Sequence, residues 1–154
     1  MKKALVVVLL IAFSSSFSQT FSLNDTQFKV GSYYRTYNIS FDLDKTALRP
    51  ESKPTLDSLI TFLNKFPNIK IEIQVHSDSR GSQIANNDLT YNRAKRILDY
   101  FISNNIAVSR LTAKGYGEVK PIISDAAISK LKTHDEKEAA YQKNRRVEFK
   151  IIAI

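Results

Sequence analysis

One run of residues constrains the fold more than any other. Between positions 69 and 76 apolar and polar residues alternate without exception: Ile69, Ile71, Ile73 and Val75 alternate with Lys70, Glu72, Gln74 and His76. Because successive side chains of a strand point to opposite faces, this pattern predicts a β-strand with one face in a core and one face in water. Such a strand needs a second layer over its apolar face.

Two stretches with helical spacing can form that layer. In the first, Pro54 suits the first turn of a helix that has Ser52 as its N-cap and stops at Pro67, with a buried stripe of Leu56, Leu59, Ile60, Leu63 and Phe66. In the second, Asn86 or Asn87 is the expected N-cap, Asn104 and Asn105 close the helix, and the expected stripe is Ala94, Ile97, Leu98, Phe101 and Ile102.

The remaining segments predict further strands. Residues 35–43 alternate with Tyr37, Ile39 and Phe41 on one face, and Phe28, Val30 and Gly31 indicate a strand that leads into a hairpin before them. Residues 111–117 read as a strand that runs into a turn at Gly115–Gly117, and residues 146–151 alternate as a closing strand. Residues 124–143 lack an apolar stripe and indicate a short helix or a mobile loop. The expected fold is α+β, with two main helices on one face of a mixed four-stranded sheet and room for an extra N-terminal strand.

The first 18 residues have the pattern of a secretory signal peptide. Lys2 and Lys3 precede an apolar core of about ten residues, which is too short to span a bilayer, and Ser16-Phe17-Ser18 offers small residues for cleavage after Ser18. We therefore divide the chain into a signal peptide (1–18), a short N-terminal segment (19–36) and one domain (37–154). The expected location is the periplasm, with association to the outer membrane left open.

Composition excludes several classes of function. The chain has no cysteine, which removes disulfides, thiol catalysis, thiolate metal sites and lipid attachment at a cysteine. Its net charge is +8, and losing Lys2 and Lys3 would leave +6. A basic exported protein favours anionic partners, but export and the lack of interleaved aromatic residues argue against nucleic acid. No apolar run after the signal peptide approaches the length of a membrane span.

The loop after the alternating strand carries the candidate site. Asp78 follows the strand, and Arg93 follows it in the second helix, where we expect the positive end of the helix dipole and Lys95 and Arg96 to add charge. An arginine fork binds carboxylates and an aspartate accepts from ammonium groups, so the pair suits a zwitterionic ligand. The spacing is equally compatible with an Asx-turn at Asp78 and a solvated or structurally paired Arg93.

The other polar residues do not indicate an enzyme. His76 is a lone histidine on the polar face of a strand, and no second ligand is spaced for zinc because His134 lies in the 119–143 segment. Ser77 and Ser79 have no base and oxyanion arrangement that would activate them. We expect no catalysis, cofactor or metal. Arg145, in Asn144-Arg145-Arg146, suits either a basic edge of the sheet or a second anion contact.

Several short motifs occur together along the chain. They are Ile39-Ser40-Phe41-Asp42, Leu48-Arg49-Pro50-Glu51-Ser52, His76-Ser77-Asp78 with Gly81, Asn86 with Leu89-Thr90 and Arg93-Ala94, Gly115-Tyr116-Gly117-Glu118 with Pro121, and Asn144-Arg145-Arg146-Val147-Glu148. With these motifs the chain resembles the OmpA-like domain, a peptidoglycan-binding module of outer-membrane proteins, peptidoglycan-associated lipoproteins and flagellar stator proteins, over about residues 38–152.

The resemblance implies a βαβαββ fold and non-covalent binding of the peptide stem of peptidoglycan. Asp78 and Arg93 match the residues that hold diaminopimelate in the family, and Asn86, Leu89 and Arg145 match positions that line the same pocket. Val75 and Ser77 depart from the family's usual Gly-His-Thr-Asp. The alternative is a protein-interaction subunit that keeps the fold without wall binding. It would bind outer-membrane or other envelope proteins through residues 119–143 or through Tyr33, Tyr34 and Tyr37.

Overall fold

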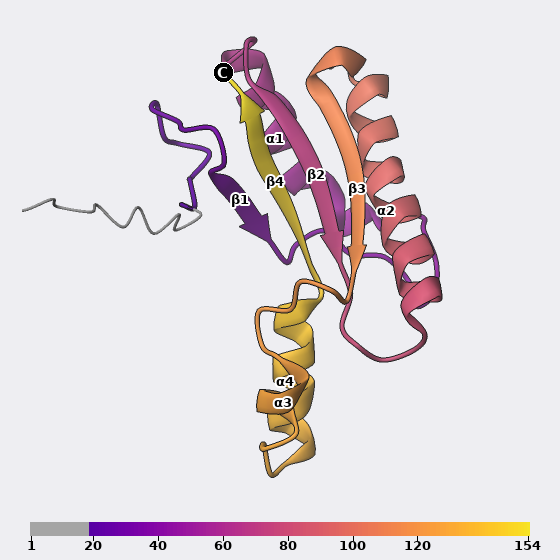
Figure 1. Ribbon diagram of the computed structural model, residues 1–154. Coiled ribbons are helices and arrows are strands. Elements are labelled where there is room, and N and C mark those ends of the chain that lie inside the picture. Colours follow the sequence, from indigo (N-terminus) through magenta and orange to yellow (C-terminus); the bar gives the residue numbers. More distant parts are fainter. Residues whose placement is uncertain (1–18) are drawn as a thin grey trace, which may run out of the picture.

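The computed structural model of the chain describes residues 19–154 (Figure 1). The predicted signal peptide, residues 1–18, lies outside the described residues. Among the described residues, no helix combines the length and the apolar character that crossing a membrane requires.

A mixed four-stranded sheet forms the centre of the molecule. Its strand order is β1-β4-β2-β3, in which β2 and β3 are parallel and the other neighbours are antiparallel. The strands are β1 (Tyr33–Thr36), β2 (Lys70–His76), β3 (Leu111–Gly117) and β4 (Arg146–Ala153). The fold is the predicted α+β arrangement with a mixed sheet.

Two long helices cover one face of this sheet. In Figure 1, α1 (Lys53–Lys65) lies behind the sheet and α2 (Gln83–Ser103) lies alongside β3. Two shorter helices, α3 (Asp125–Ile128) and α4 (His134–Asn144), extend beyond the end of the sheet and connect β3 to β4. Single 3-10 turns at Pro50–Ser52 and Val108–Arg110 precede α1 and β3.

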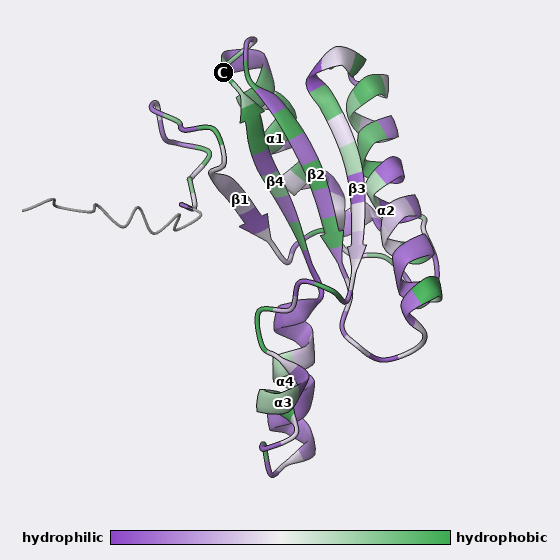
Figure 2. Ribbon diagram, in the orientation of Figure 1, coloured by the Kyte–Doolittle hydropathy of each residue, from purple (hydrophilic) through white to green (hydrophobic). Residues whose placement is uncertain are grey.

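The register between β2 and β4 builds the core. Ile71 pairs with Ile151, Ile73 with Phe149 and Val75 with Val147, so these buried side chains share the face toward the helices. From the helices, the core receives Leu56, Leu59, Phe62, Leu63, Ala94, Ile97 and Phe101. Figure 2 shows the apolar residues of β2 and β4 alternating with hydrophilic ones, as the sequence pattern predicts.

The N-terminal segment adds aromatic rings to this core. The ring of Phe21 stacks on Phe62 at a centroid distance of 5.4 Å, and the ring of Phe28 meets Phe66 edge-on at 4.9 Å. Only an isolated bridge between Thr20 and Tyr33 replaces the extra N-terminal strand and hairpin that residues 19–34 predict. The proposed boundary between the N-terminal segment and the domain remains a prediction.

The first strand lies earlier than predicted. β1 ends at Thr36, because the Thr36 hydroxyl accepts a hydrogen bond from the Asn38 amide and turns the chain away from the sheet. The predicted strand over 35–43 is therefore wrong beyond Thr36. Ser40 is held instead by the Ser52 hydroxyl, which accepts a hydrogen bond from the Ser40 amide.

Helix α2 also begins earlier than predicted. Ser82 is its N-cap and accepts a hydrogen bond from the Ala85 amide, so Asn86 and Asn87 lie inside the helix. The buried stripe contains Ala94, Ile97 and Phe101 as expected, but Ile102 is 40% exposed. The end of the helix at Asn104 agrees with the prediction.

The close approach of α2 to β3 requires glycine. A Cβ atom on Gly115 would lie 2.2 Å from the Tyr91 amide nitrogen, so the helix backbone can reach the strand only at a residue without a side chain. Gly117 ends the strand with φ of +50° and donates its amide to the Thr90 hydroxyl at 2.9 Å. The predicted turn at Gly115–Gly117 is therefore the last part of β3.

The segment 124–143 folds into helices α3 and α4 and not into a loop. Thr133 and Glu136 form a reciprocal capping box at the start of α4, and this Thr-x-x-Glu pattern is a helix-start signal in the sequence. Figure 2 shows α4 as largely hydrophilic. Helix α4 lacks an apolar stripe because it packs against little more than α3 and the ends of the strands.

Candidate functional site

The candidate site lies where β2 ends and the loop to α2 begins. Asp78 follows β2 by two residues, and the side chain is 7% exposed. The loop between the two elements is short, because Ser82 already caps α2. The strand and the helix therefore fix Asp78 from both sides.

Two arginines donate hydrogen bonds to the Asp78 carboxylate. Arg80 donates from its backbone amide and from Nε to Oδ1, at 3.0 and 3.1 Å, and from Nη2 to Oδ2 at 2.8 Å. Arg145, at the end of α4, donates from Nη1 to Oδ2 at 2.5 Å. A carboxylate has about four acceptor positions, so these contacts use all of them.

Both arginines also contact Glu138 of α4. Arg80 Nη1 lies 2.9 Å from Glu138 Oε2, and Arg145 Nη2 lies 2.7 Å from Glu138 Oε1. The guanidinium of Arg80 lies over the Tyr141 ring at 4.5 Å. Helix α4 is thus tied to the loop after β2 by charged groups.

These contacts set the protonation of the site. Burial by itself raises the pKa of Asp78, but hydrogen bonds from Arg80 and Arg145 outweigh it and hold that pKa below its ordinary value. Hydrogen bonds from the same two arginines lower the pKa of Glu138. Both carboxylates are therefore ionised at neutral pH.

Arg93 reaches the same region from α2 without touching Asp78. Its Nε donates to the Lys45 carbonyl at 2.9 Å and its Nη2 to the Asp42 carbonyl at 3.0 Å, while its guanidinium lies over the Phe41 ring. Burial lowers the pKa of Arg93. Its Nη1 makes no hydrogen bond within the part of the chain that the structure describes.

The charges around Arg93 differ from the sequence-based expectation in two ways. Helix α2 starts at Gln83, so Arg93 lies ten residues beyond the positive end of the helix dipole, whose effect is confined to the first turn. Lys95 and Arg96 line a separate cavity with Thr46 and Asn92. The positive charge beside Arg93 comes instead from Arg80 and Arg145.

All five residues named from the sequence line one cavity of about 490 Å³, which we call the first cavity. They are Asp78, Asn86, Leu89, Arg93 and Arg145, and the same cavity is also lined by Phe41, Leu43, Asp44, Ser77, Arg80 and Glu138. Asn86 shapes it by donating Nδ2 to the Asp78 carbonyl at 3.2 Å and to Glu118 Oε2 at 2.6 Å.

Three charged residues of this cavity, Asp44, Arg80 and Glu138, were not among the residues identified from the sequence. Arg80 had a usable signal, since it lies two residues after Asp78 in a loop that must fold back on itself. Glu138 had none, because only the packing of α4 brings it within reach of Arg80 and Arg145.

The arrangement is suited to binding charged groups. Within residues 19–154, no group of three or more histidine, cysteine, aspartate or glutamate side chains is placed to hold a metal ion. The Ser77 hydroxyl, which lines the first cavity, has no hydrogen-bond partner among the described residues. No base in that part of the chain therefore activates it.

The chain is similar in sequence to a known protein family and to individual curated proteins. A family model described as OmpA family matches residues 40–134. Outer membrane porin F of Pseudomonas fluorescens is 33% identical over 116 residues, which cover 75% of this chain and 32% of the porin. The peptidoglycan-associated lipoprotein of Rhizobium meliloti (strain 1021) is 37% identical over 84 residues, which cover 54% of this chain and 48% of the lipoprotein.

The solved structures agree on the fold. The peptidoglycan-associated lipoprotein from Burkholderia pseudomallei superimposes with a TM-score of 0.60 at 23% sequence identity, covering 73% of this chain and 87% of that structure. The chain spans less than half the length of the two curated relatives described above.

Proposed function

Because this chain belongs to the OmpA family, we propose that it binds peptidoglycan non-covalently through the diaminopimelate residue of the stem peptide. Members of this family are structural proteins, and the chain is not an enzyme. We assign the binding to the domain 37–154 and the location to the periplasm, where the protein would anchor or organise the cell envelope.

One observation carries the proposal. The first cavity brings three guanidinium groups, of Arg80, Arg93 and Arg145, together with the carboxylates of Asp78 and Glu138. The free end of a diaminopimelate residue carries an ammonium and a carboxylate on one carbon. A site with both signs of charge recognises such a group, and a cavity of about 490 Å³ has room for it.

The carboxylate of the ligand would bind at Arg93. Arg93 has Nη1 free of hydrogen bonds to the described residues, and its Nε and Nη2 are held by two backbone carbonyls, so the guanidinium plane is fixed. A fixed and partly desolvated guanidinium binds a carboxylate more strongly than a mobile one.

The ammonium must replace one of the contacts that Asp78 makes. Arg80 is the contact that can leave, because its side chain is 51% exposed and its guanidinium already lies 2.9 Å from Glu138 and over Tyr141. Arg145 is less exposed and remains. Asp78 then accepts from the ligand, and Arg80 keeps Glu138 as its partner.

Sedimentation with purified diaminopimelate-type sacculi tests the proposal. The parent protein should sediment with the sacculi, and Asp78→Ala and Arg93→Ala should each lose at least tenfold in affinity, since charged hydrogen bonds contribute about 1.5–3 kcal/mol each. The matched control is Arg96→Ala, which removes the same group from a position outside the first cavity.

Each variant needs a check of its fold by circular dichroism. Equal binding by Arg93→Ala and Arg96→Ala would contradict the named site. No binding by a folded parent would contradict wall binding altogether and would favour an envelope protein-interaction subunit with the same fold.

A further inference from the structure

The side of the sheet that faces away from α1 and α2 carries a charged surface, which we call the open face. In β4, Lys150 lies opposite Tyr33 of β1 and Glu72 of β2, and Glu148 lies opposite Arg35 of β1. Residues opposite one another in neighbouring strands share a face, and in β4 these two alternate with the residues of the core. Their side chains therefore point away from the helices.

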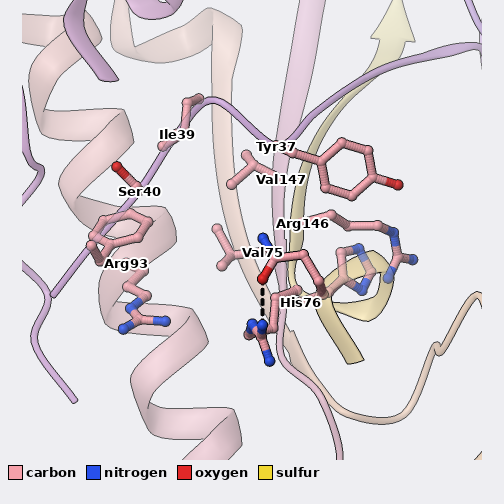
Figure 3. A pocket seen from close by; sticks show the side chains of 11 residues that line it. Tyr37, Ile39, Ser40, Val75, His76, Arg93, Arg146 and Val147 are labelled. Carbon is pink, nitrogen blue, oxygen red and sulfur yellow. Dashed lines mark hydrogen bonds between the residues drawn. The ribbon is translucent and has the colours of Figure 1, made fainter. Parts of the chain in front are cut away.

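The same division holds at the end of the sheet. Figure 3 shows His76 and Arg146 on one side of Val75 and Val147, with Arg93 on the other. His76 and Arg146 are also partners in the register of β2 and β4, so the open face continues to the ends of these strands. Neither of the two lines the first cavity, which has Arg93 in its wall.

The arginines and carboxylates of the open face are already paired with one another. Arg35 Nε and Arg146 Nε lie 2.8 and 2.7 Å from Glu148 Oε1, and the Glu148 side chain is 9% exposed. Both guanidiniums also donate to further oxygens of the protein. Glu72 accepts a hydrogen bond from the Tyr116 hydroxyl at 3.1 Å. The directional donors that would recognise one carboxylate of a partner are therefore largely used within the sheet.

Lysines supply the free charge of this surface. Lys114 and Lys120 are exposed and Lys150 is half-buried, and none of them forms an ion pair within residues 19–154. The ammonium groups of Lys114 and Lys120 lie instead over the Tyr116 ring, at 5.1 and 3.9 Å from its centre. The open face thus carries an excess of positive charge that has no partner of opposite sign in this part of the chain.

We propose that the open face binds the surface of an anionic membrane. A lysine is a hydrated point charge on a flexible stem, so it suits a diffuse layer of lipid phosphates better than a single carboxylate of a protein. The strands lie about 4.8 Å apart, which spreads these charges over a surface and does not converge them on one point. Half-buried Tyr33 and Tyr116 suit a membrane interface, because a tyrosine ring has an apolar body and a polar tip.

The inference goes beyond the proposed function and does not depend on it. Of the open-face residues named above, none lines the first cavity. One molecule can therefore hold a wall peptide in that cavity while its open face lies on a membrane, and it would link the two.

Co-sedimentation of residues 19–154 with lipid vesicles tests the inference. The parent should sediment with vesicles in which about one lipid in three is phosphatidylglycerol, and not with vesicles of phosphatidylcholine alone. A triple variant with Lys114→Gln, Lys120→Gln and Lys150→Gln should lose at least about tenfold in affinity for the anionic vesicles. Each lysine close to such a surface contributes about fivefold, and added salt should weaken the binding of the parent.

The matched control is a triple variant with Lys53→Gln, Lys65→Gln and Lys95→Gln. It removes the same charge from exposed positions of α1 and α2, on the other side of the sheet, and should bind the anionic vesicles nearly as well as the parent. Circular dichroism verifies that both variants fold. Sedimentation with sacculi is measured separately, and the variant of the open face should bind them as the parent does.

Three outcomes would overturn the inference. Equal losses in the two triple variants would show that net charge, and not the open face, drives the binding. A parent that does not bind the anionic vesicles would exclude a membrane as the partner. A parent that binds soluble poly-L-glutamate but not the vesicles would assign the open face to an acidic protein. Each of these results leaves the proposed function standing, because wall binding is read from the sacculi.

Discussion

The two sides of the sheet are stabilised by different forces. On the helix side, α1 and α2 bury apolar residues such as Leu63, Phe101 and Phe149, all at 0% exposure. On the other side no helix covers the strands within residues 19–154 (Figure 1). There Glu148 accepts hydrogen bonds from Arg35 at 2.8 Å and Arg146 at 2.7 Å.

The end of the sheet that carries α3 and α4 resembles the polar side, because polar contacts predominate there as well. Ile128 and Ala140 are the buried apolar residues of these two helices. Asn144, which is 1% exposed, accepts from the amides of Ile122 and Ile123 and donates to the Ile123 carbonyl. Ser79 donates to Asp125 of α3 at 2.5 Å.

The two sides differ in how their stability responds to salt and pH. Apolar burial is non-directional and tolerates changes in salt and pH, whereas ion pairs and hydrogen bonds depend on both. The candidate site combines Glu138 and Arg145, from α4 and its end, with Asp78 and Arg80 of the loop after β2 and Arg93 of α2.

The largest expected effect is a loss of stability when a side chain of the apolar core is truncated. Phe101→Ala removes a fully buried ring that lies 5.9 Å from the Phe149 ring, and it should lower the free energy of unfolding by about 3–5 kcal/mol. Urea denaturation measures the change. The matched control is Ile102→Ala, at a side chain that is 40% exposed, with an expected cost of under about 1 kcal/mol. Similar losses for both would contradict the contrast between the two sides.

The next effect concerns His76 on the polar side. Its ring stacks on Tyr116 at 5.2 Å, and neither of its nitrogens has a hydrogen-bond partner among the described residues. Burial first, and then the nearby charge of Arg146, lower the pKa of His76 to about 3. Lys120 and Arg35 also repel a protonated ring, and Glu148, 3.7 Å away, attracts it.

The sign of the pH dependence follows from this shift. Between about pH 6.5, the ordinary pKa of histidine, and pH 3 the unfolded chain binds a proton at His76 and the folded chain does not, so stability falls as pH falls. By about pH 4 the loss from this residue is on the order of 3 kcal/mol. His76→Phe keeps the stacked ring and should flatten the profile, whereas His134→Gln, at an exposed position, should not. An unchanged slope in His76→Phe would contradict this assignment.

The smallest effect should be confined to the α3–α4 end. Asn144→Ala removes three hydrogen bonds that hold this end to the loop after β3, and it should speed amide exchange in α3 and α4 about 10-fold or more, equivalent to about 1–2 kcal/mol. Exchange in α2 and β2 should stay as in the parent. Lys143→Ala, at the exposed neighbouring position, is the control. A uniform increase over the whole chain would show that the two regions unfold as one.

The sequence predicted the body of the fold from local patterns. The alternation at 69–76 specified β2, and Pro54 and Pro67 bounded α1 within one or two residues. Prediction from the sequence was less successful where a polar side chain forms a hydrogen bond with the backbone of another segment. Residues 37–41 alternate like a strand, but the Thr36 hydroxyl and the Ser52 hydroxyl hold the backbone out of the sheet. Asn86 was predicted to be a helix cap, but it lies inside α2 and its side-chain amide donates to the Asp78 carbonyl.

By itself the sequence determined the strand and helix order, the apolar core and the five residues that line the first cavity, because periodicity and short motifs are written in neighbouring positions. Only the tertiary structure decided the partners of those five residues. Asp78 meets Arg80 and Arg145 and not Arg93, and Glu138 joins them from α4. Ion pairs between residues as far apart as 78 and 145 depend on how separate elements pack, and no local pattern in the chain encodes that packing.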